Sequence, residues 1–202
     1  MAAFDLPYIP ITSNVLTSFL KGFKAPGQKI IEMEKNGEIV RLKRGLFIRA
    51  TEKLNMMLIA NHIYGPSYVS RESALRYHGL IPEHVYTTTS VSINRSRIFE
   101  NKLGRFSYDY LPMRYYCLGI EIKKENGIYF QVATPEKALA DLIVLSPKVR
   151  LRYLSETREY LENDLRLDMD IFITLKPERF EEFAAVSKKS QAMLNIVKLL
   201  RQ

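Results

Sequence analysis

Tryptophan is absent from this 202-residue sequence, while cysteine occurs once and histidine three times. The single cysteine, Cys117, cannot form a disulfide within the chain, and its apolar neighbours predict a half-buried strand position. The histidines, His62, His78 and His84, lack the companion cysteines and the close pairing that a zinc site needs. We therefore expect no internal disulfide and no bound metal.

Long apolar segments are also missing. The best candidate, Leu54 to Ile63, is shorter than the roughly 18 residues that cross a bilayer, and Asn55 and Asn61 interrupt it. Residues 1–10 lack the basic start, the apolar stretch and the small-residue cleavage site of a secretory signal. These absences predict a cytoplasmic protein with no membrane partner.

Positive charge is abundant and unevenly distributed. Thirty lysines and arginines against 22 acidic residues give a formal net charge of +8. Residues 1–50 carry eight basic residues against four acidic ones, whereas residues 106–202 carry fifteen against fourteen. The excess in the first half favours a polyanionic partner such as nucleic acid.

The first fifty residues have the pattern of two short helices followed by a β-hairpin. A capping hydroxyl before apolar residues at helical spacing predicts a helix over residues 12–20. Pro26 is placed to open a second helix, and Asn36-Gly37 to end it. Two apolar runs in residues 38–50, joined at Lys43-Arg44-Gly45, predict the hairpin. The side chains expected to face a core are Val15, Leu16, Phe19 and Leu20 in the first helix and Ile30, Ile31 and Met33 in the second.

Residues 51–202 predict a larger domain of strands and helices. Helical patterns cover residues 52–64, 70–79 and 148–202, together with a segment that starts at Thr134-Pro135-Glu136; Ser70 is placed as the cap of the second of these helices. Strands are predicted at residues 85–93, 105–111 and 128–132, and we expect them to form one antiparallel sheet. The boundary near Arg49 to Lys53 has no proline or glycine linker, so the two parts should be closely docked. The expected fold class is α+β, with an N-terminal winged helix-turn-helix (1–50) and a mixed antiparallel-sheet and helix domain (51–202).

A helix-turn-helix with a basic hairpin can place its second helix in the major groove while the hairpin contacts the DNA backbone. Gln28 and Lys29 lie in the first turn of the predicted second helix. There Gln28 can form hydrogen bonds with adenine, and Lys29 with guanine or a phosphate. Phosphate contacts are expected from the basic residues of the hairpin, namely Arg41, Lys43, Arg44 and Arg49. The alternative is that these charges only keep an exposed hairpin edge from aggregating.

An enzymatic site has less support. Glu136, Lys137 and Asp141 lie on one predicted helix, where an acid, a base and a metal ligand could meet. Capping by Glu136 and an ordinary ion pair between Lys137 and Asp141 explain the same residues more simply. No glycine-rich phosphate loop, nucleophile elbow or HExxH motif is present. We expect neither catalysis nor a cofactor.

Three strings in this order and spacing resemble the AbiEi-type antitoxin family of transcriptional regulators. They are RLKRGLFIR (Arg41 to Arg49), PSYVSRESALRYHGLIPE (Pro66 to Glu83) and ATPEKALADLIVL (Ala133 to Leu145), and the resemblance runs from about Ile11 to Pro147. It implies a winged N-terminal domain that binds double-stranded DNA at the promoter of its own operon and represses it. It also implies a C-terminal domain that counteracts a co-transcribed nucleotidyltransferase-like toxin of the AbiEii type. In such type IV toxin-antitoxin systems the two proteins need not form a stable complex.

Carried over to this chain, the resemblance assigns DNA contacts to Gln28 and Lys29 on the second helix and to Arg41, Lys43 and Arg44 in the wing. One departure concerns the helices, because only one precedes the expected recognition helix where winged domains usually have two. Residues 52–64 could supply the missing helix, or the domain could bind DNA weakly or only as a dimer.

Two further hypotheses belong to other classes of protein. In the first, the chain is a protein-interaction module with a vestigial DNA-binding face. In the second, it is an enzyme that acts on nucleotides or nucleic acid through Glu136 and Asp141.

Overall fold

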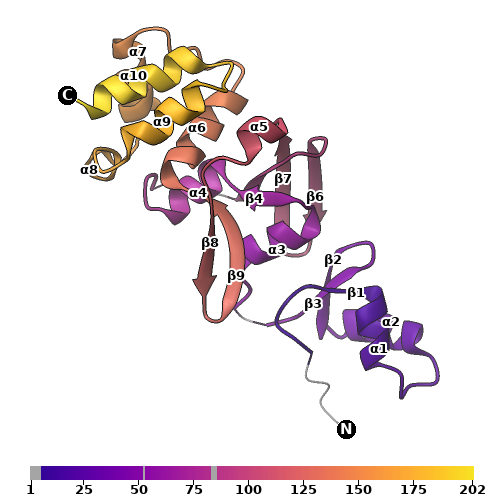
Figure 1. Ribbon diagram of the computed structural model, residues 1–202. Helices are drawn as coiled ribbons and strands as arrows, with labels where there is room; N and C mark the ends of the chain where they lie inside the picture. Colours follow the sequence, from indigo (N-terminus) through magenta and orange to yellow (C-terminus); the bar gives the residue numbers. More distant parts are fainter. Residues whose placement is uncertain (1–5, 52, 83–85) are drawn as a thin grey trace.

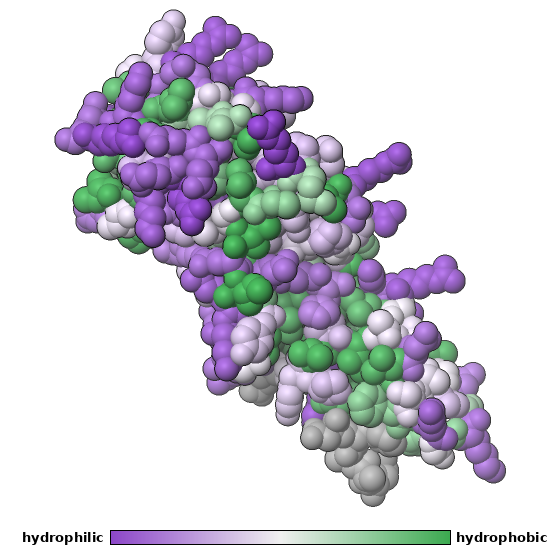
Figure 2. All heavy atoms as spheres, in the orientation of Figure 1, coloured by the Kyte–Doolittle hydropathy of each residue, from purple (hydrophilic) through white to green (hydrophobic). Residues whose placement is uncertain are grey.

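In the computed structural model, three parts follow one another along the molecule (Figure 1). The structure describes residues 6–51, 53–82 and 86–202. A small N-terminal lobe lies at one end, a six-stranded sheet in the middle and the C-terminal helices at the other end. On the face drawn in Figure 2, hydrophilic side chains gather over the C-terminal helices, and apolar ones are more frequent toward the N-terminal lobe. Because it combines helices with one antiparallel and one mixed sheet, the chain is α+β in class.

The N-terminal lobe consists of two helices on a three-stranded antiparallel sheet with the strand order β1-β3-β2. Its elements are β1 (Ile11–Thr12), α1 (Ser13–Phe19), α2 (Pro26–Lys35), β2 (Ile39–Lys43) and β3 (Leu46–Arg49). The predicted helices and hairpin are confirmed as elements. The strand β1 was not predicted, because two residues are too few to show a pattern.

Local sequence signals explain where these helices begin and end. The Thr12 hydroxyl accepts a hydrogen bond from the Val15 amide at 3.4 Å, which caps α1. Pro26 opens α2, where its missing amide proton costs nothing. Gly37 follows Asn36 with φ +74°, a left-handed conformation that glycine adopts readily and that ends the helix.

The small sheet is shared between two apolar cores, because successive side chains of a strand point to opposite faces. Phe47 packs in a small cluster under α1 and α2, whereas its neighbours Leu46 and Ile48 belong to the main core of the molecule. A hydrogen bond of 3.0 Å from the Asn101 side chain to the Leu42 carbonyl adds to this contact. The N-terminal lobe is therefore closely docked on the central part.

Some residues predicted to face the core of this lobe are exposed. Val15 is 43% exposed, Phe19 40% and Ile31 52%, whereas Leu16 and Leu20 are fully buried. Each helix contacts the sheet along one narrow stripe only, and no described element covers its outer side. Apolar spacing alone could not tell how wide the buried stripe is.

The central sheet has the order β6-β7-β5-β4-β9-β8. Its strands are β4 (Ser67–Val69), β5 (Thr87–Ser92), β6 (Arg97–Asn101), β7 (Gly104–Tyr110), β8 (Ile120–Glu125) and β9 (Ile128–Ala133). The pairs β5–β7 and β4–β9 are parallel and the other pairs are antiparallel, so the prediction of one antiparallel sheet is wrong. The reason is topological: the chain passes from β5 to the edge strand β6 and then returns as β7 between the two.

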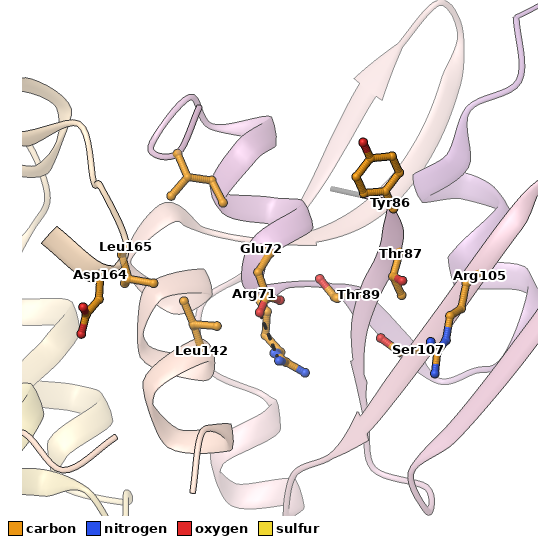
Figure 3. Close-up of a pocket in the computed structure, with 11 residues that line it drawn as sticks. Arg71, Glu72, Tyr86, Thr87, Thr89, Arg105, Ser107, Leu142, Asp164 and Leu165 are labelled. Carbon is orange, nitrogen blue, oxygen red and sulfur yellow. Dashed lines mark hydrogen bonds and ion pairs between the residues drawn. The ribbon is translucent and has the colours of Figure 1, made fainter. Parts of the chain in front are cut away.

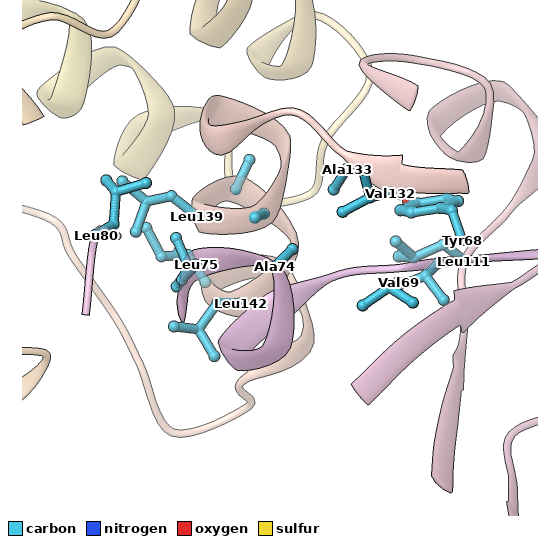
Figure 4. Packing of buried hydrophobic residues seen from close by; sticks show 14 of the residues in the cluster. Tyr68, Val69, Ala74, Leu75, Leu80, Leu111, Val132, Ala133, Leu139 and Leu142 are labelled. Carbon is cyan, nitrogen blue, oxygen red and sulfur yellow. The ribbon is translucent and has the colours of Figure 1, made fainter. Parts of the chain in front are cut away.

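Helices cover the two faces of this sheet. On β7, Tyr108 and Asp109 point to opposite faces. The Tyr108 hydroxyl donates to the Ala60 carbonyl of α3 (Met56–Ile63) at 2.7 Å, and Asp109 pairs with Arg71 of α4 (Arg71–Tyr77). Behind α4 lies α6 (Pro135–Leu145), and Figure 4 shows the apolar side chains that pack between α4 and α6. α3 therefore covers one face, and α4 and α6 cover the other.

The C-terminal part is helical, as predicted. After the short α5 (Met113–Tyr116) and α6, the chain forms α7 (Leu154–Glu159), a π-helical turn η1 (Tyr160–Asp164), α8 (Met169–Phe172), α9 (Pro177–Ala184) and α10 (Ser190–Leu200). Cys117 ends α5 and is exposed, so the expected half-buried strand position is wrong. Among the described helices, none has both the length and the apolar character needed to span a membrane.

Candidate nucleic-acid interface

The two predicted base-reading residues lie in the first turn of α2 but differ in their surroundings. Gln28 is exposed. Lys29 is half-buried, with its ammonium 3.0 Å from a carboxylate oxygen of Glu32 and 5.6 Å from the centre of the Phe23 ring. Gln28 is thus directly accessible to a ligand, whereas Lys29 would have to release Glu32 in order to bind one.

Arg41 is engaged within the protein. Its Nη2 lies 2.6 Å from Glu34 Oε2, its Nε donates to both oxygens of that carboxylate at 3.1 Å, and its guanidinium stacks over the Phe47 ring at 4.9 Å. These hydrogen bonds lower the pKa of Glu34 and raise the pKa of Arg41. The pair connects α2 to the edge strand β2 and neutralises the Arg41 charge in this state.

Lys43 and Arg44 are presented at the hairpin turn. Arg44 is exposed and Lys43 half-buried, and across the described ranges neither has an ion-pair partner. The turn is possible because Gly45 adopts φ +79°. Its carbonyl accepts a hydrogen bond of 2.9 Å from the Ser13 amide, which fixes the turn against the start of α1.

Arg49 lies at the other end of β3, so the structure does not bring it to the turn with Lys43 and Arg44. Its guanidinium stacks over the Tyr8 ring at 5.1 Å and donates to the Leu6 carbonyl at 3.4 Å. These contacts tie the segment before β1 to the sheet. They explain Arg49 without a DNA contact.

One basic residue near this surface could not be found from the sequence pattern. Lys102 is exposed in the β6–β7 turn, next to Asn101, which contacts β2. Its charge contributes to the lowered pKa of Glu34, so it lies close to the Arg41–Glu34 pair. The juxtaposition depends on how the sheet docks against the N-terminal lobe, about sixty residues away along the chain.

The ion pair predicted on α6 is present, but its surroundings are not ordinary. Lys137 Nζ lies 3.0 Å from Asp141 Oδ1, and both side chains are completely buried. Asp141 Oδ2 accepts hydrogen bonds from the Tyr68 hydroxyl at 2.9 Å and from the Ser70 hydroxyl at 2.6 Å. Lys137 Nζ also donates to the Tyr115 carbonyl at 2.9 Å. We call these five residues the buried ionic cluster.

Burial dominates the titration of this cluster. It raises the pKa of Asp141 and lowers the pKa of Lys137, since each charged form loses its hydration, and the opposite charge of the partner acts against both shifts. The pKa of Tyr68 lies well above its usual value because of burial and the adjacent carboxylate. The prediction that Ser70 caps α4 is wrong in one respect: Ser70 occupies the cap position, but its hydroxyl binds Asp141 and makes no capping hydrogen bond.

The residues proposed for an enzymatic site are held inside the protein. Glu136 is 7% exposed and accepts a hydrogen bond from the Lys176 amide at 3.2 Å, while Asp141 is fully buried. Thr134 caps α6 through the Lys137 amide, as predicted. This packing favours a structural role for both carboxylates.

Two of the histidines also have protein partners. His62 contacts the Leu58 carbonyl at 2.9 Å and His78 the Ala133 carbonyl at 2.8 Å. His84 lies outside the described residues. Within the residues that the structure describes, no three histidine, cysteine or acidic side chains gather in a way that could hold a metal ion.

The chain matches no family model and no curated protein. The resemblance to the AbiEi-type antitoxins therefore stays a prediction from the three strings.

Proposed function

We propose that this protein is a cytoplasmic DNA-binding repressor of its own operon and the antitoxin of a nucleotidyltransferase-like toxin, as the AbiEi resemblance implies. Residues 1–50 act as a winged helix-turn-helix, and residues 51–202 counteract the toxin. The observation that carries the DNA-binding part is the run α1–α2–β2–β3, with Gln28 exposed at the start of α2 and Lys43 and Arg44 at the hairpin turn. The chain has no catalytic role in this proposal.

The position of α3 bears on this arrangement. A winged domain usually has one helix more than the lobe contains, and α3 contacts β2 within the main core, on the face of the small sheet opposite to α1 and α2. Residues 52–64 were one expected source of this helix; the alternative was a domain that binds DNA weakly or only as a dimer. In the proposal α3 joins the winged lobe to the rest of the molecule, and the lobe contacts DNA with α2 and the hairpin.

The internal ion pairs of Lys29 and Arg41 are compatible with phosphate binding. Both pairs are open to solvent on one side, with Glu32 58% and Arg41 43% exposed, and solvent screening limits such pairs to about 0–1 kcal/mol. DNA carries one negative charge per ~1.7 Å of its axis, so a phosphate can replace Glu32 or Glu34 at modest cost. Lys43 and Arg44 require no such exchange, and we expect them to contribute most.

The test is a fluorescence anisotropy titration of the full chain with its own upstream DNA and with a scrambled duplex, at two salt concentrations. The double variant Lys43→Ala, Arg44→Ala should weaken binding and reduce the slope of log affinity against log salt by about two, about one for each phosphate contact. The control Arg152→Ala, Lys198→Ala removes two exposed charges from the C-terminal part and should change the affinity little. Equal effects of the two double variants, or no preference for the upstream DNA, would refute the proposal.

The alternative of a protein-interaction module has one observation in its favour. The N-terminal lobe exposes several large apolar side chains, namely Tyr8, Ile9, Val15, Phe19, Phe23 and Ile31. Protein surfaces of this kind often mark contacts with a partner. A stable complex with the product of the neighbouring gene, together with an absence of salt-dependent DNA binding, would select this alternative.

A further inference from the structure

A cavity of about 590 Å³ opens between the central sheet and the helices that follow it (Figure 3). Its volume lies within the range of small-molecule sites, about 300–1,000 Å³. The residues around it come from α4, β5, β7, α6 and the π-helical turn. Neither the DNA-binding proposal nor the antitoxin proposal uses this cavity.

The side of the cavity that faces the sheet is polar. Thr87 on β5 stands beside Arg105 on β7, and Thr89 beside Ser107, because the two parallel strands are in register at these positions. The Thr89 hydroxyl is already used, since it donates to the Ser70 carbonyl at 2.7 Å. Thr87, Ser107 and Arg105 remain as the groups that can bind an anion on this wall.

The opposite side of the cavity is apolar. Leu142 of α6, Leu165 after the π-helical turn and Ile81 after α4 line it, and the Asp164 carboxylate lies at its rim. Figure 3 places Arg71 and Glu72 between this apolar side and the polar wall. The cavity therefore has an apolar end, a polar end and charged groups between them.

Arg71 and Glu72 carry unused hydrogen-bonding groups. The Arg71 guanidinium pairs with Asp109 and lies 3.2 Å from Glu72 Oε1, yet its buried Nε–H has no acceptor in the described structure. The buried Glu72 Oε2 likewise has no donor within the residues described. A buried donor and acceptor without partners cost free energy, so such atoms call for an explanation. Both residues line the cavity, and a ligand that offers an acceptor and a donor side by side would satisfy both atoms if the two side chains turned toward it.

The position of Arg71 is imposed by its surroundings. Its φ of +55° is uncommon for a residue with a side chain. The preceding Ser70 is fixed by hydrogen bonds from its amide to the Thr89 carbonyl at 3.0 Å and from its hydroxyl to Asp141 at 2.6 Å. Unfavourable backbone conformations that the fold maintains in this way are concentrated at ligand sites.

We propose that this cavity binds a mononucleotide. The base lies against Ile81, Leu142 and Leu165 with one polar edge toward Arg71 and Glu72, and the phosphate lies against Arg105, Ser107 and Thr87. Nucleobases present donors and acceptors on one flat apolar frame, which is the combination that the middle and the apolar side of the cavity require.

The acidic residues nearby restrict how the phosphate can bind. Arg71 already faces two carboxylates, so it contributes a hydrogen bond to the ligand and little net charge. Arg105 has one carboxylate partner, Glu100, at 3.5 Å, and both side chains are more than half exposed. An exposed pair of this kind is weak, and the phosphate can displace Glu100. Arg105 is therefore the main phosphate ligand in this proposal.

The test is isothermal titration of the full chain with the common nucleoside 5′-monophosphates, the corresponding nucleosides and inorganic phosphate. At least one monophosphate should bind more tightly than both its nucleoside and phosphate alone. Arg105→Ala should weaken that binding about tenfold or more, as expected for the loss of a hydrogen bond to a charged group. Ser107→Leu should abolish nucleotide binding, because the larger side chain fills part of the cavity without a change of charge.

The matched control is Arg97→Ala, which removes an exposed arginine of the same hairpin whose guanidinium lies over Tyr64 and Phe99 instead of lining the cavity. It should leave nucleotide binding unchanged. The proposal is overturned if no monophosphate binds at millimolar concentration, if phosphate alone binds as tightly, or if Arg97→Ala and Arg105→Ala have the same effect. DNA binding by Lys43 and Arg44 is measured separately, so the two proposals can fail independently.

Discussion

The N-terminal lobe and the central part each contain an ion pair between a helix residue and a nearby partner, and the two pairs differ in how deeply they are buried. Arg41 and Glu34 lie at the surface, with side-chain exposures of 43% and 25%. Lys137 and Asp141 are fully buried. The surface pair can exchange its partner for a phosphate at small cost, whereas the buried pair cannot lose one member without leaving a charge in an apolar interior. The first suits a binding surface and the second a structural centre.

The buried ionic cluster also explains why two of the three strings in the sequence belong together. Tyr68 and Ser70 come from the string at residues 66–83, and Lys137 and Asp141 from the string at residues 133–145. These segments form adjacent elements of the sheet and its helical cover. Their residues hold Ser70 in place, and Ser70 in turn positions Arg71 at the cavity. Requirements of folding and of one part of the proposed ligand site, namely Arg71, Glu72, Ile81 and Leu142, therefore coincide in these strings.

The largest effect is expected from Asp141→Ala. The change removes the partner of a completely buried lysine and the acceptor of two buried hydroxyl groups, and breaking such a pair costs about 3–5 kcal/mol. Urea unfolding followed by circular dichroism measures the free energy of unfolding. Asp170→Ala, at an exposed aspartate, should cost less than about 1 kcal/mol.

A second variant separates the charge from the packing in this cluster. Replacing both members, Lys137→Met with Asp141→Leu, leaves no uncompensated charge and should be less destabilising than Asp141→Ala alone. If the single and double variants lose the same stability, the ion pair is not the reason for the loss, and the contrast with the surface pair fails.

A smaller effect is expected from Gly119→Ala. Gly119 has φ +63°, and a Cβ atom there would lie 2.8 Å from Lys137 Cβ and 3.1 Å from Phe183 Cζ. We expect a loss of about 1–3 kcal/mol from the forced repacking, in addition to the left-handed strain. Gly127→Ala is the matched control, because Gly127 has φ +79° but no atom within 4 Å of an added Cβ. Equal losses in the two variants would show that backbone strain alone matters and that Lys137 tolerates displacement.

The local part of the fold could be predicted from the sequence. The cap at Thr12, the prolines that open α2 and α6 and the left-handed Gly37 act within a few residues, so their effect can be seen in the sequence. The edge strands β6 and β8 escaped prediction because they are rich in charged residues and lack a clear apolar alternation. The parallel pairs escaped because they join segments that are distant in the chain.

The candidate site residues divide in the same way, into those that local sequence signals place and those that depend on contacts between distant segments. Gln28, Lys43 and Arg44 were located correctly on the first turn of a helix and at a hairpin turn. Tertiary contacts determine that Arg41 pairs with Glu34 and that Arg49 donates to the Leu6 carbonyl. The burial of Lys137 and Asp141 likewise depends on residues about seventy positions away, which no helical spacing can reveal.

The smallest change in stability and the most informative change in binding are expected from Glu34→Gln. Removal of the surface pair should alter the free energy of unfolding by less than about 1 kcal/mol. In the proposed DNA complex, however, the variant releases the Arg41 guanidinium and removes a negative charge from the interface. Both consequences should strengthen binding to the upstream DNA, which the anisotropy titration measures.

The control for this variant is Glu181→Gln, which breaks an exposed pair of the same kind, Glu181 with Arg201 at 2.8 Å, in the C-terminal helices. It removes the same charge far from the proposed interface and should leave DNA affinity nearly unchanged. If Glu34→Gln also leaves the affinity unchanged while the Lys43 and Arg44 double variant lowers it, Arg41 makes no phosphate contact. Its pair with Glu34 then only connects α2 to β2, and the contact surface is reduced to the start of α2 and the hairpin turn.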